Sequence, residues 1–257
     1  MIIRQEQLSL FEKERHRQFK QEMADHLRHF APRHAQALGE PALLDAIGLG
    51  IRNAEVHGLT LRGPVRFYIE MMFLFGTYFD SDIQYPWAAR ALTEYPELPQ
   101  MLRAAGLHEK ALHYIQTVRG EGNRLLFEAL RRLRALADEP VPGSSENLIL
   151  ELAARLERIY PDKCAYIGRD TLLELLSAGA ERANENGMNS VLGKALFGLL
   201  AFELGHRFYD DPLYRWAGDI IRNSAAVDQH QGANRLREAA LIYLDGALRD
   251  APPEMRL

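Results

Sequence analysis

The stretch that decides the fold is GTYFDSDIQYPWA at residues 76–88, because a close relative of it, GHRFYDDPLYRWA, occupies residues 205–217. Both copies follow a long apolar run, and both contain one of the two tryptophans of the chain. Their shared positions are Gly76/Gly205, Phe79/Phe208, Asp82/Asp211, Tyr85/Tyr214, Trp87/Trp216 and Ala88/Ala217. A motif of glycines and aromatics that recurs at one offset indicates a structural unit present twice.

The likeness extends outward from this motif. A shift of 129 positions lays residues 22–88 over residues 151–217 without a gap, and 17 of these 67 positions are identical. Many identities fall on glycine, proline and tryptophan, the residues that shape a backbone. The sequence therefore predicts an internal duplication.

Both copies have the periodicity of helices. Apolar residues recur at spacings of three and four before Gly58 and again before Gly187, which predicts amphipathic helices closed by a left-handed glycine. Gly50 and Gly179 lie inside these helices, where glycine is unfavourable, so we expect another helix to approach closely there. The apolar positions are Leu43, Leu44, Ile47, Ile51 and Ala54, and then Leu172, Leu173, Leu176, Ala180 and Ala183.

A second pair of helices is apolar nearly all round. We expect it at about residues 65–78 and 194–207, and we expect these helices to be central and buried. Two further helices should end before Pro32 and Pro161. The predicted fold class is all-α, with two tandem pseudo-symmetric helical-bundle repeats.

The boundary between the repeats is predicted at the proline- and serine-rich run at residues 138–147. It divides a first repeat at residues 1–137 from a second at residues 148–257, and the two either pack as one compact domain or form separate lobes. Beyond the motif the offset falls to 111, so the first repeat has 18 more residues than the second. The difference lies in segment 97–120, with His108, His113 and Tyr114, which is a plausible place for a divergent function.

Composition excludes several classes of protein. A net charge of -4 and a pI near 6.2 give no electrostatic footprint for nucleic acid. The single cysteine, Cys164, rules out a disulfide within the chain. The most apolar windows are interrupted by Glu70 and Glu203 and are too short to span a bilayer. We expect a cytoplasmic protein that uses no cofactor and contacts neither membrane nor nucleic acid.

The repeated motif has two interpretations. In one, its aromatic rings lie in the core and its aspartates cap helices. Asp211 before Pro212 suits an N-cap, whereas in the first copy Pro86 lies four residues after Asp82, which indicates a helix that begins later. In the other, the rings form a paired surface that grips a protein partner. The candidate partner-binding residues are Phe79, Asp82, Tyr85, Trp87, Phe208, Asp211, Tyr214 and Trp216.

Signals for catalysis are weak. Glu203 and His206 have the Glu-x-x-His spacing of di-iron bundles, but the first copy has Leu74 and Thr77 at these positions, so half of such a site is missing. The chain has no Gly-x-Ser-x-Gly elbow, and Gly48-Leu49-Gly50 lies inside a predicted helix instead of after a strand. We therefore expect no catalytic residue and no metal, with Glu203 and His206 as the weak candidates for a metal site.

The opening MIIRQEQLSLFEKERHRQF and the segment FYIEMMFLFGTYFDSDIQYPWAARAL resemble uncharacterised helical proteins of proteobacteria that are encoded near type VI secretion spike and effector genes. The resemblance supplies no active site. It implies a non-enzymatic adaptor or accessory factor that binds a secreted effector or spike component. The alternatives are an immunity protein that neutralises a neighbouring toxin and a metal-binding helical-bundle enzyme.

Overall fold

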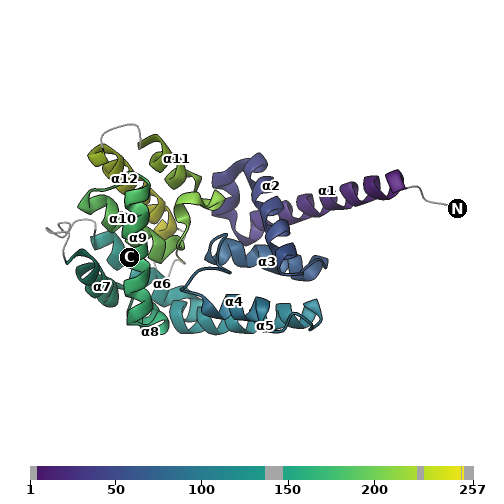
Figure 1. Ribbon diagram of the computed structural model, residues 1–257, viewed down its shortest axis with the longest axis horizontal. Helices are drawn as coiled ribbons and strands as arrows, with labels where there is room; N and C mark the ends of the chain where they lie inside the picture. The colour runs from purple at the N-terminus through teal and green to yellow at the C-terminus, as the bar shows by residue number, and fades with distance from the viewer. Residues whose placement is uncertain (1–4, 137–146, 225–228, 250, 252–257) are drawn as a thin grey trace.

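The computed structural model describes residues 5–136, 147–224, 229–249 and 251, and every regular element among them is a helix (Figure 1). The predicted all-α class is thus confirmed. The predicted linker lies outside the described residues except for Asn147. Among the described residues, no helix combines the length and the apolar run that crossing a membrane requires.

The N-terminal part of the chain forms a long projecting helix and a group of shorter ones. The helix α1 extends away from the rest of the molecule, and only its C-terminal part packs, mainly on α2 (Figure 1). The elements are α1 (Gln5–Phe30), α2 (Pro32–Val56), α3 (Arg62–Phe75), α4 (Pro86–Thr93), α5 (Gln100–Tyr114), the π-helical turn η1 (Ile115–Arg119), the 3-10 turn η2 (Glu121–Asn123) and α6 (Arg124–Leu136).

The C-terminal part repeats several of these bounds at a distance of 129 residues. Both ends of α10 are displaced by 129 from those of α3, and α8 with α9 spans the range that corresponds to α2. The elements are α7 (Leu148–Ile159), α8 (Pro161–Ile167), α9 (Arg169–Glu185), α10 (Val191–Leu204), η3 (Phe208–Asp210), η4 (Pro212–Tyr214), α11 (Arg215–Ser224) and α12 (Gln229–Arg249).

The predicted glycine stops are confirmed. Gly58 has a φ of 68° and Gly187 a φ of 75°, the left-handed region in which glycine is unstrained. The residue after each glycine donates its backbone N–H back to the helix. Leu59 donates to the Ala54 carbonyl at 2.9 Å, and Met188 donates to the Ala183 carbonyl at 2.7 Å. Leu59 and Met188 are both buried, so at each of these two turns the chain folds back onto the helix that precedes it.

The predicted close approaches also occur. A Cβ built on Gly179 would lie 2.9 Å from the Cα of Gly198, so α9 and α10 touch backbone to backbone. A Cβ on Gly50 would lie 2.7 Å from Ile69 Cγ1 and 2.8 Å from Met72 Sδ of α3. Glycine is retained at both positions because a side chain would separate these helices.

The two apolar helices are buried as expected, but their predicted bounds were wrong by three residues at each end. They span residues 62–75 and 191–204 instead of 65–78 and 194–207. Gly76 and Gly205, with φ of 95° and 107°, end them, because neither value belongs to a right-handed helix. The apolar residues beyond, including Phe79 and Phe208, lie in the corner that follows.

Buried apolar side chains from both parts of the chain form one contiguous cluster. Segment 97–120 contributes to it through Leu107, Tyr114 and Val118, although the second part has no counterpart of this segment. The hydroxyl of Tyr160 donates to the Val118 carbonyl at 3.1 Å, and Tyr166 lies edge-on to Tyr114 at 5.0 Å. Segment 97–120, which contains α5 and η1, therefore packs on α8 and on Tyr160 between α7 and α8.

Candidate functional site

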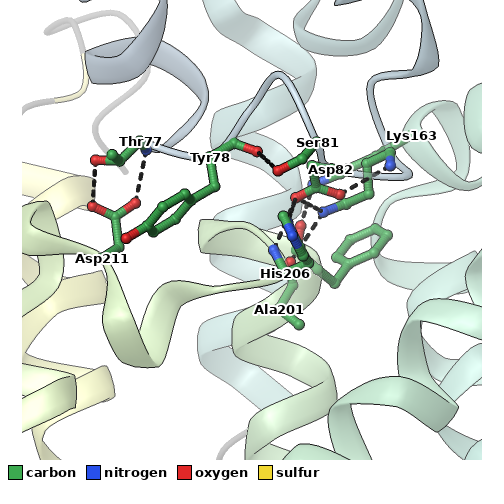
Figure 2. Close-up of polar contacts among 10 residues, drawn as sticks. Thr77, Tyr78, Ser81, Asp82, Lys163, Ala201, His206 and Asp211 are labelled. Carbon is green, nitrogen blue, oxygen red and sulfur yellow. Dashed lines mark hydrogen bonds and ion pairs between the residues drawn. The ribbon is translucent and has the colours of Figure 1, made fainter. Parts of the chain in front are cut away.

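The corners that follow α3 and α10 lie against each other and exchange hydrogen bonds (Figure 2). The Asp82 carboxylate accepts the backbone N–H of His206 at 2.8 Å, and the Asp211 carboxylate accepts that of Thr77 at 2.8 Å. Thr77 and His206 are the residues that follow Gly76 and Gly205, so each aspartate caps the chain where the opposite helix ends. We call this arrangement the reciprocal clasp.

Each aspartate of the clasp also caps its own corner. Asp82 accepts the backbone N–H of Gln84 at 2.9 Å, and Asp211 accepts that of Leu213 at 2.9 Å. Asp211 is the N-cap of η4 with Pro212 at the first position, as the sequence predicts, and α4 begins at Pro86, in line with the predicted later start of the first-copy helix. The carboxylates therefore connect the two corners while satisfying donors that would otherwise be buried unpaired.

The glycines of the clasp allow this contact. A Cβ on Gly76 would lie 3.0 Å from the Leu204 carbonyl oxygen and 3.4 Å from Asp211 Oδ2. A Cβ on Gly205 would lie 3.4 Å from Asp82 Oδ2. Both glycines have a positive φ, and Gly76 also has a close neighbour, which explains why glycine stands at both positions.

Side chains around the two aspartates differ. The hydroxyl of Thr77 donates to Asp211 at 2.6 Å, whereas the amide of Gln84 donates to Asp82 at 3.3 Å and to the Ala201 carbonyl at 3.0 Å. Burial raises the pKa of Asp211, and the hydrogen bonds from Thr77 and Leu213 oppose this rise. The clasp is thus polar, buried and almost completely hydrogen-bonded.

Seven of the eight residues predicted as partner-binding are buried, and Trp216 is half-buried. Trp87 lies in a cluster of rings with Phe75, Tyr85 and Tyr114, at centroid distances of 5.6 to 6.0 Å. Trp216 stacks on Tyr243 at 5.7 Å. A surface that grips a partner needs exposed rings, so burial favours the other interpretation, in which the aromatics belong to the core and the aspartates are caps.

The placement of Glu203 and His206 on one helix was wrong. The helix α10 ends at Leu204, and the positive φ of Gly205 turns His206 out of its path. The imidazole Nδ1 of His206 lies 3.3 Å from Asp82 Oδ2, so the histidine belongs to the clasp. Within the described part of the chain, no group of three or more histidine, cysteine, aspartate or glutamate side chains is placed to hold a metal ion.

Glu203 instead belongs to a buried polar cluster with Lys163 and Arg119. The Lys163 ammonium donates to the Phe202 carbonyl and lies 4.2 Å from the centroid of the Phe202 ring. The Arg119 guanidinium donates to the Leu74 carbonyl at 2.7 Å. Glu203 makes no hydrogen bond with a described residue, and its Oε1 is inaccessible to solvent. Burial raises the pKa of Glu203 against the opposing effect of the two cations, and burial lowers the pKa of Lys163.

This cluster lies at the polar end of a large apolar cavity. The cavity has a volume of about 360 Å³, and a smaller one of about 50 Å³ adjoins it and shares Leu74, Arg119, Glu203 and Tyr214. The wall of the larger cavity is mainly leucine from α6, α10 and α12, including Leu130, Leu133, Leu199, Leu200, Leu241 and Leu244. His34 of α2 also lines it, and burial lowers the pKa of this histidine to about 4, so its ring is neutral at pH 7.

The sequence did not predict this cavity or the two cations, Lys163 and Arg119, at its polar end. One signal was present, because Glu203 interrupts an otherwise apolar helix. A charged residue that faces the core on such a helix marks a buried polar site. Nothing in the local sequence distinguishes Lys163 or Arg119 from cations on an exposed helix face.

The pKa shift of Glu203 has a measurable consequence. Its pKa is raised in the folded protein, so the protonated form stabilises the fold below about pH 4.5, and that stabilisation is lost as the pH rises through the folded pKa. Glu203→Gln cannot ionise. We expect its melting temperature to exceed that of the wild type at pH 8 and to converge with it at pH 4. The exposed Glu174→Gln is the control, and parallel curves for wild type and Glu203→Gln would contradict the assignment.

A second feature lies on the outside of the molecule, where exposed apolar side chains gather at the start of α5. Met101 is 60% and Leu102 58% exposed. We call this surface the α5 patch; its members are Leu61, Tyr95, Leu98, Met101 and Leu102. Three of these residues, Leu98, Met101 and Leu102, lie in segment 97–120, where the sequence indicates that the two copies differ.

The α5 patch is held together by one glutamine. Gln100 Oε1 accepts the backbone N–H groups of Thr60 at 2.7 Å and of Leu61 at 2.9 Å, and its Nε2 donates to the Thr60 hydroxyl at 3.0 Å. These bonds tie the loop before α3 to the first turn of α5. A group of exposed apolar side chains beside a backbone that is fixed by hydrogen bonds is a candidate interaction surface.

Comparison with models of protein families, with curated proteins and with solved structures finds no match to this chain.

Proposed function

We propose that the protein is a non-enzymatic interaction protein that binds a protein partner through the α5 patch. The observation that carries this proposal is the set of exposed apolar side chains that Gln100 holds at the junction of α3 and α5. Exposed leucine and methionine side chains lose water when a partner covers them, which favours binding by roughly 25 cal/mol per Å² of apolar surface.

The proposed scaffold for this surface is a pair of pseudo-symmetric helical repeats joined by the reciprocal clasp. Equal offsets of helix bounds, matched left-handed glycines and reciprocal aspartate bonds support this organisation. In this organisation, segment 97–120 is the main difference between the first repeat and the second. Its buried residues fill part of the core, and the first turn of α5 carries part of the α5 patch.

The proposed partner is a type VI secretion effector or spike component, for which the protein serves as an adaptor or accessory factor. This identity rests on the resemblance of the opening sequence and of segment 67–92. A toxin recovered as the partner, with deletion of this protein lethal only while that toxin is active, would instead identify an immunity protein.

The double variant Met101→Glu/Leu102→Glu tests the surface. Two charges on exposed positions should leave the free energy of unfolding within about 0.5 kcal/mol of the wild type. Capture of the native-host partner by full-length protein should fall about tenfold or more, since charge at the centre of an apolar interface is strongly unfavourable. Mass spectrometry of the captured proteins identifies the partner and measures its amount.

The matched control is Val56→Glu/Ile242→Glu, which charges two exposed apolar residues outside the patch. It should bind the partner as the wild type does. Equal capture by both double variants would remove the α5 patch as the binding surface. Capture of a partner with no role in secretion would remove the adaptor proposal.

A further inference from the structure

We propose that the 360 Å³ cavity binds a small uncharged amphipathic molecule, whose apolar body packs on the leucines of α6, α10 and α12 and whose hydroxyl group donates to Glu203. This site lies between α6, α10 and α12 and involves none of the α5 patch residues. The inference is therefore independent of the proposed protein partner.

The size and lining of the cavity set the apolar part of the ligand. A cavity of about 150 Å³ lined by apolar side chains is large enough for benzene, and pockets for small molecules begin at about 300 Å³. At about 360 Å³ this cavity holds a larger apolar body than a single ring. Leucines from α6, α10 and α12 line it, so a chain or ring system placed there contacts apolar side chains from more than one direction.

Glu203 sets the polar part of the ligand. Its carboxyl group borders both cavities yet makes no hydrogen bond with a described residue. A buried polar group without a partner is costly, because it has lost water and gained nothing in return. A hydroxyl group at this end of the cavity supplies the missing donor when a rotation of the carboxylate turns its unpaired oxygen toward the cavity.

The charges around Glu203 exclude a charged head group. Arg119 and Lys163 act on Glu203 electrostatically, and Arg155 and Arg237 also line the larger cavity. An ammonium ligand would be repelled by these cations. A carboxylate ligand has no hydrogen to donate to Glu203 and would place a like charge beside it. An uncharged donor avoids both costs.

The helical turn that carries Arg119 also supports a ligand site at this end of the cavity. Arg119 is the last residue of η1, a π-helical turn, and its guanidinium reaches the carbonyl end of α3. π-Helical turns are rare, and they occur frequently at functional sites because they redirect side chains. This turn belongs to the inserted segment 97–120, so the cation at the polar end of the cavity is specific to the first part of the chain.

Two isomers of the same formula test the proposal on the full-length protein. The probe is 1-octanol, which has a hydroxyl donor, and its control is 1-methoxyheptane, which has none. Calorimetric titration should show one octanol bound per chain with a dissociation constant below about 1 mM. The ether should bind about tenfold more weakly, since it leaves Glu203 without a donor.

Two variants locate the binding. Ala240→Phe places a ring in the cavity from α12 and should weaken octanol binding about tenfold or more without lowering the melting temperature. Its control, Ile242→Phe on the same helix, is exposed and should bind as the wild type does. Glu203→Leu should retain binding of both isomers and lose the preference for the alcohol.

Three results would overturn the inference. They are the absence of octanol binding to the wild type, octanol binding that Ala240→Phe leaves unchanged, and equal affinity of the wild type for the two isomers. The first two remove the cavity as a binding site, and the third removes Glu203 as its polar determinant.

Discussion

Asp211→Ala is expected to lower the free energy of unfolding by about 3–5 kcal/mol, because it leaves three buried donors unpaired at roughly 1–3 kcal/mol each. The Asp211 carboxylate accepts the N–H and the hydroxyl of Thr77 and the N–H of Leu213. Alanine leaves these three donors without an acceptor in a buried place, and it also removes the cap of η4. Chemical denaturation monitored by circular dichroism measures the loss.

The neighbouring aspartate provides the matched control for this prediction. Asp210 is exposed and pairs with Arg207 at 2.6 Å, three residues away. A surface pair of this kind contributes about 0–1 kcal/mol, so Asp210→Ala should hardly change stability. Similar losses for Asp210→Ala and Asp211→Ala would mean that the clasp contributes no more than an ordinary surface pair.

Trp87→Ala is expected to lower the free energy of unfolding by about 3–5 kcal/mol, because it leaves a large cavity in the core. Trp87 is only 8% exposed and contacts Phe75, Tyr85 and Tyr114, whose edge-to-face and tilted geometries add to the burial of its ring. The melting temperature and the denaturation midpoint of the full-length variant measure this effect.

Trp216→Ala is the natural comparison for Trp87→Ala. Trp216 stands at the corresponding position of the second copy, but it is half-buried and its ring contact is with Tyr243. Its loss should cost clearly less than that of Trp87. Equal losses at the two positions would contradict the difference in burial, and a small loss at Trp87 would show that its ring is not part of the core.

Local sequence signals predicted the helices and their glycine stops because both depend on neighbours along the chain. The spacing of apolar residues gave the amphipathic faces, and Gly58 and Gly187 were recognisable from the apolar residue that follows each. The ends of α3 and α10 were misplaced because hydrophobicity continues past Gly76 and Gly205. The apolar residues after Gly76 and Gly205 reflect burial of the two corners and do not reveal the positive φ of either glycine.

The sequence predicts the local hydrogen bonds of the clasp but not those between its two corners. The spacing from Asp211 to Leu213 reveals a local cap, whereas the bond from Thr77 crosses 134 residues of sequence and depends on how the two corners pack. The cavity was invisible for the same reason, since its walls come from helices distant in sequence. Glu203 was noticed in the sequence, but only as a weak metal candidate together with His206, which the end of α10 separates from it.

The central claim is that each aspartate holds the backbone of the opposite corner, and amide hydrogen exchange tests it most directly. The amides of Thr77 and His206 follow helix ends and would exchange quickly in an isolated corner. In the full-length protein both should be slowed by about a thousandfold or more, as expected for amides that open only with the whole fold. Asp211→Ala should release the Thr77 amide more than any other clasp amide. Rapid exchange of Thr77 and His206 in the wild type would contradict the reciprocal clasp.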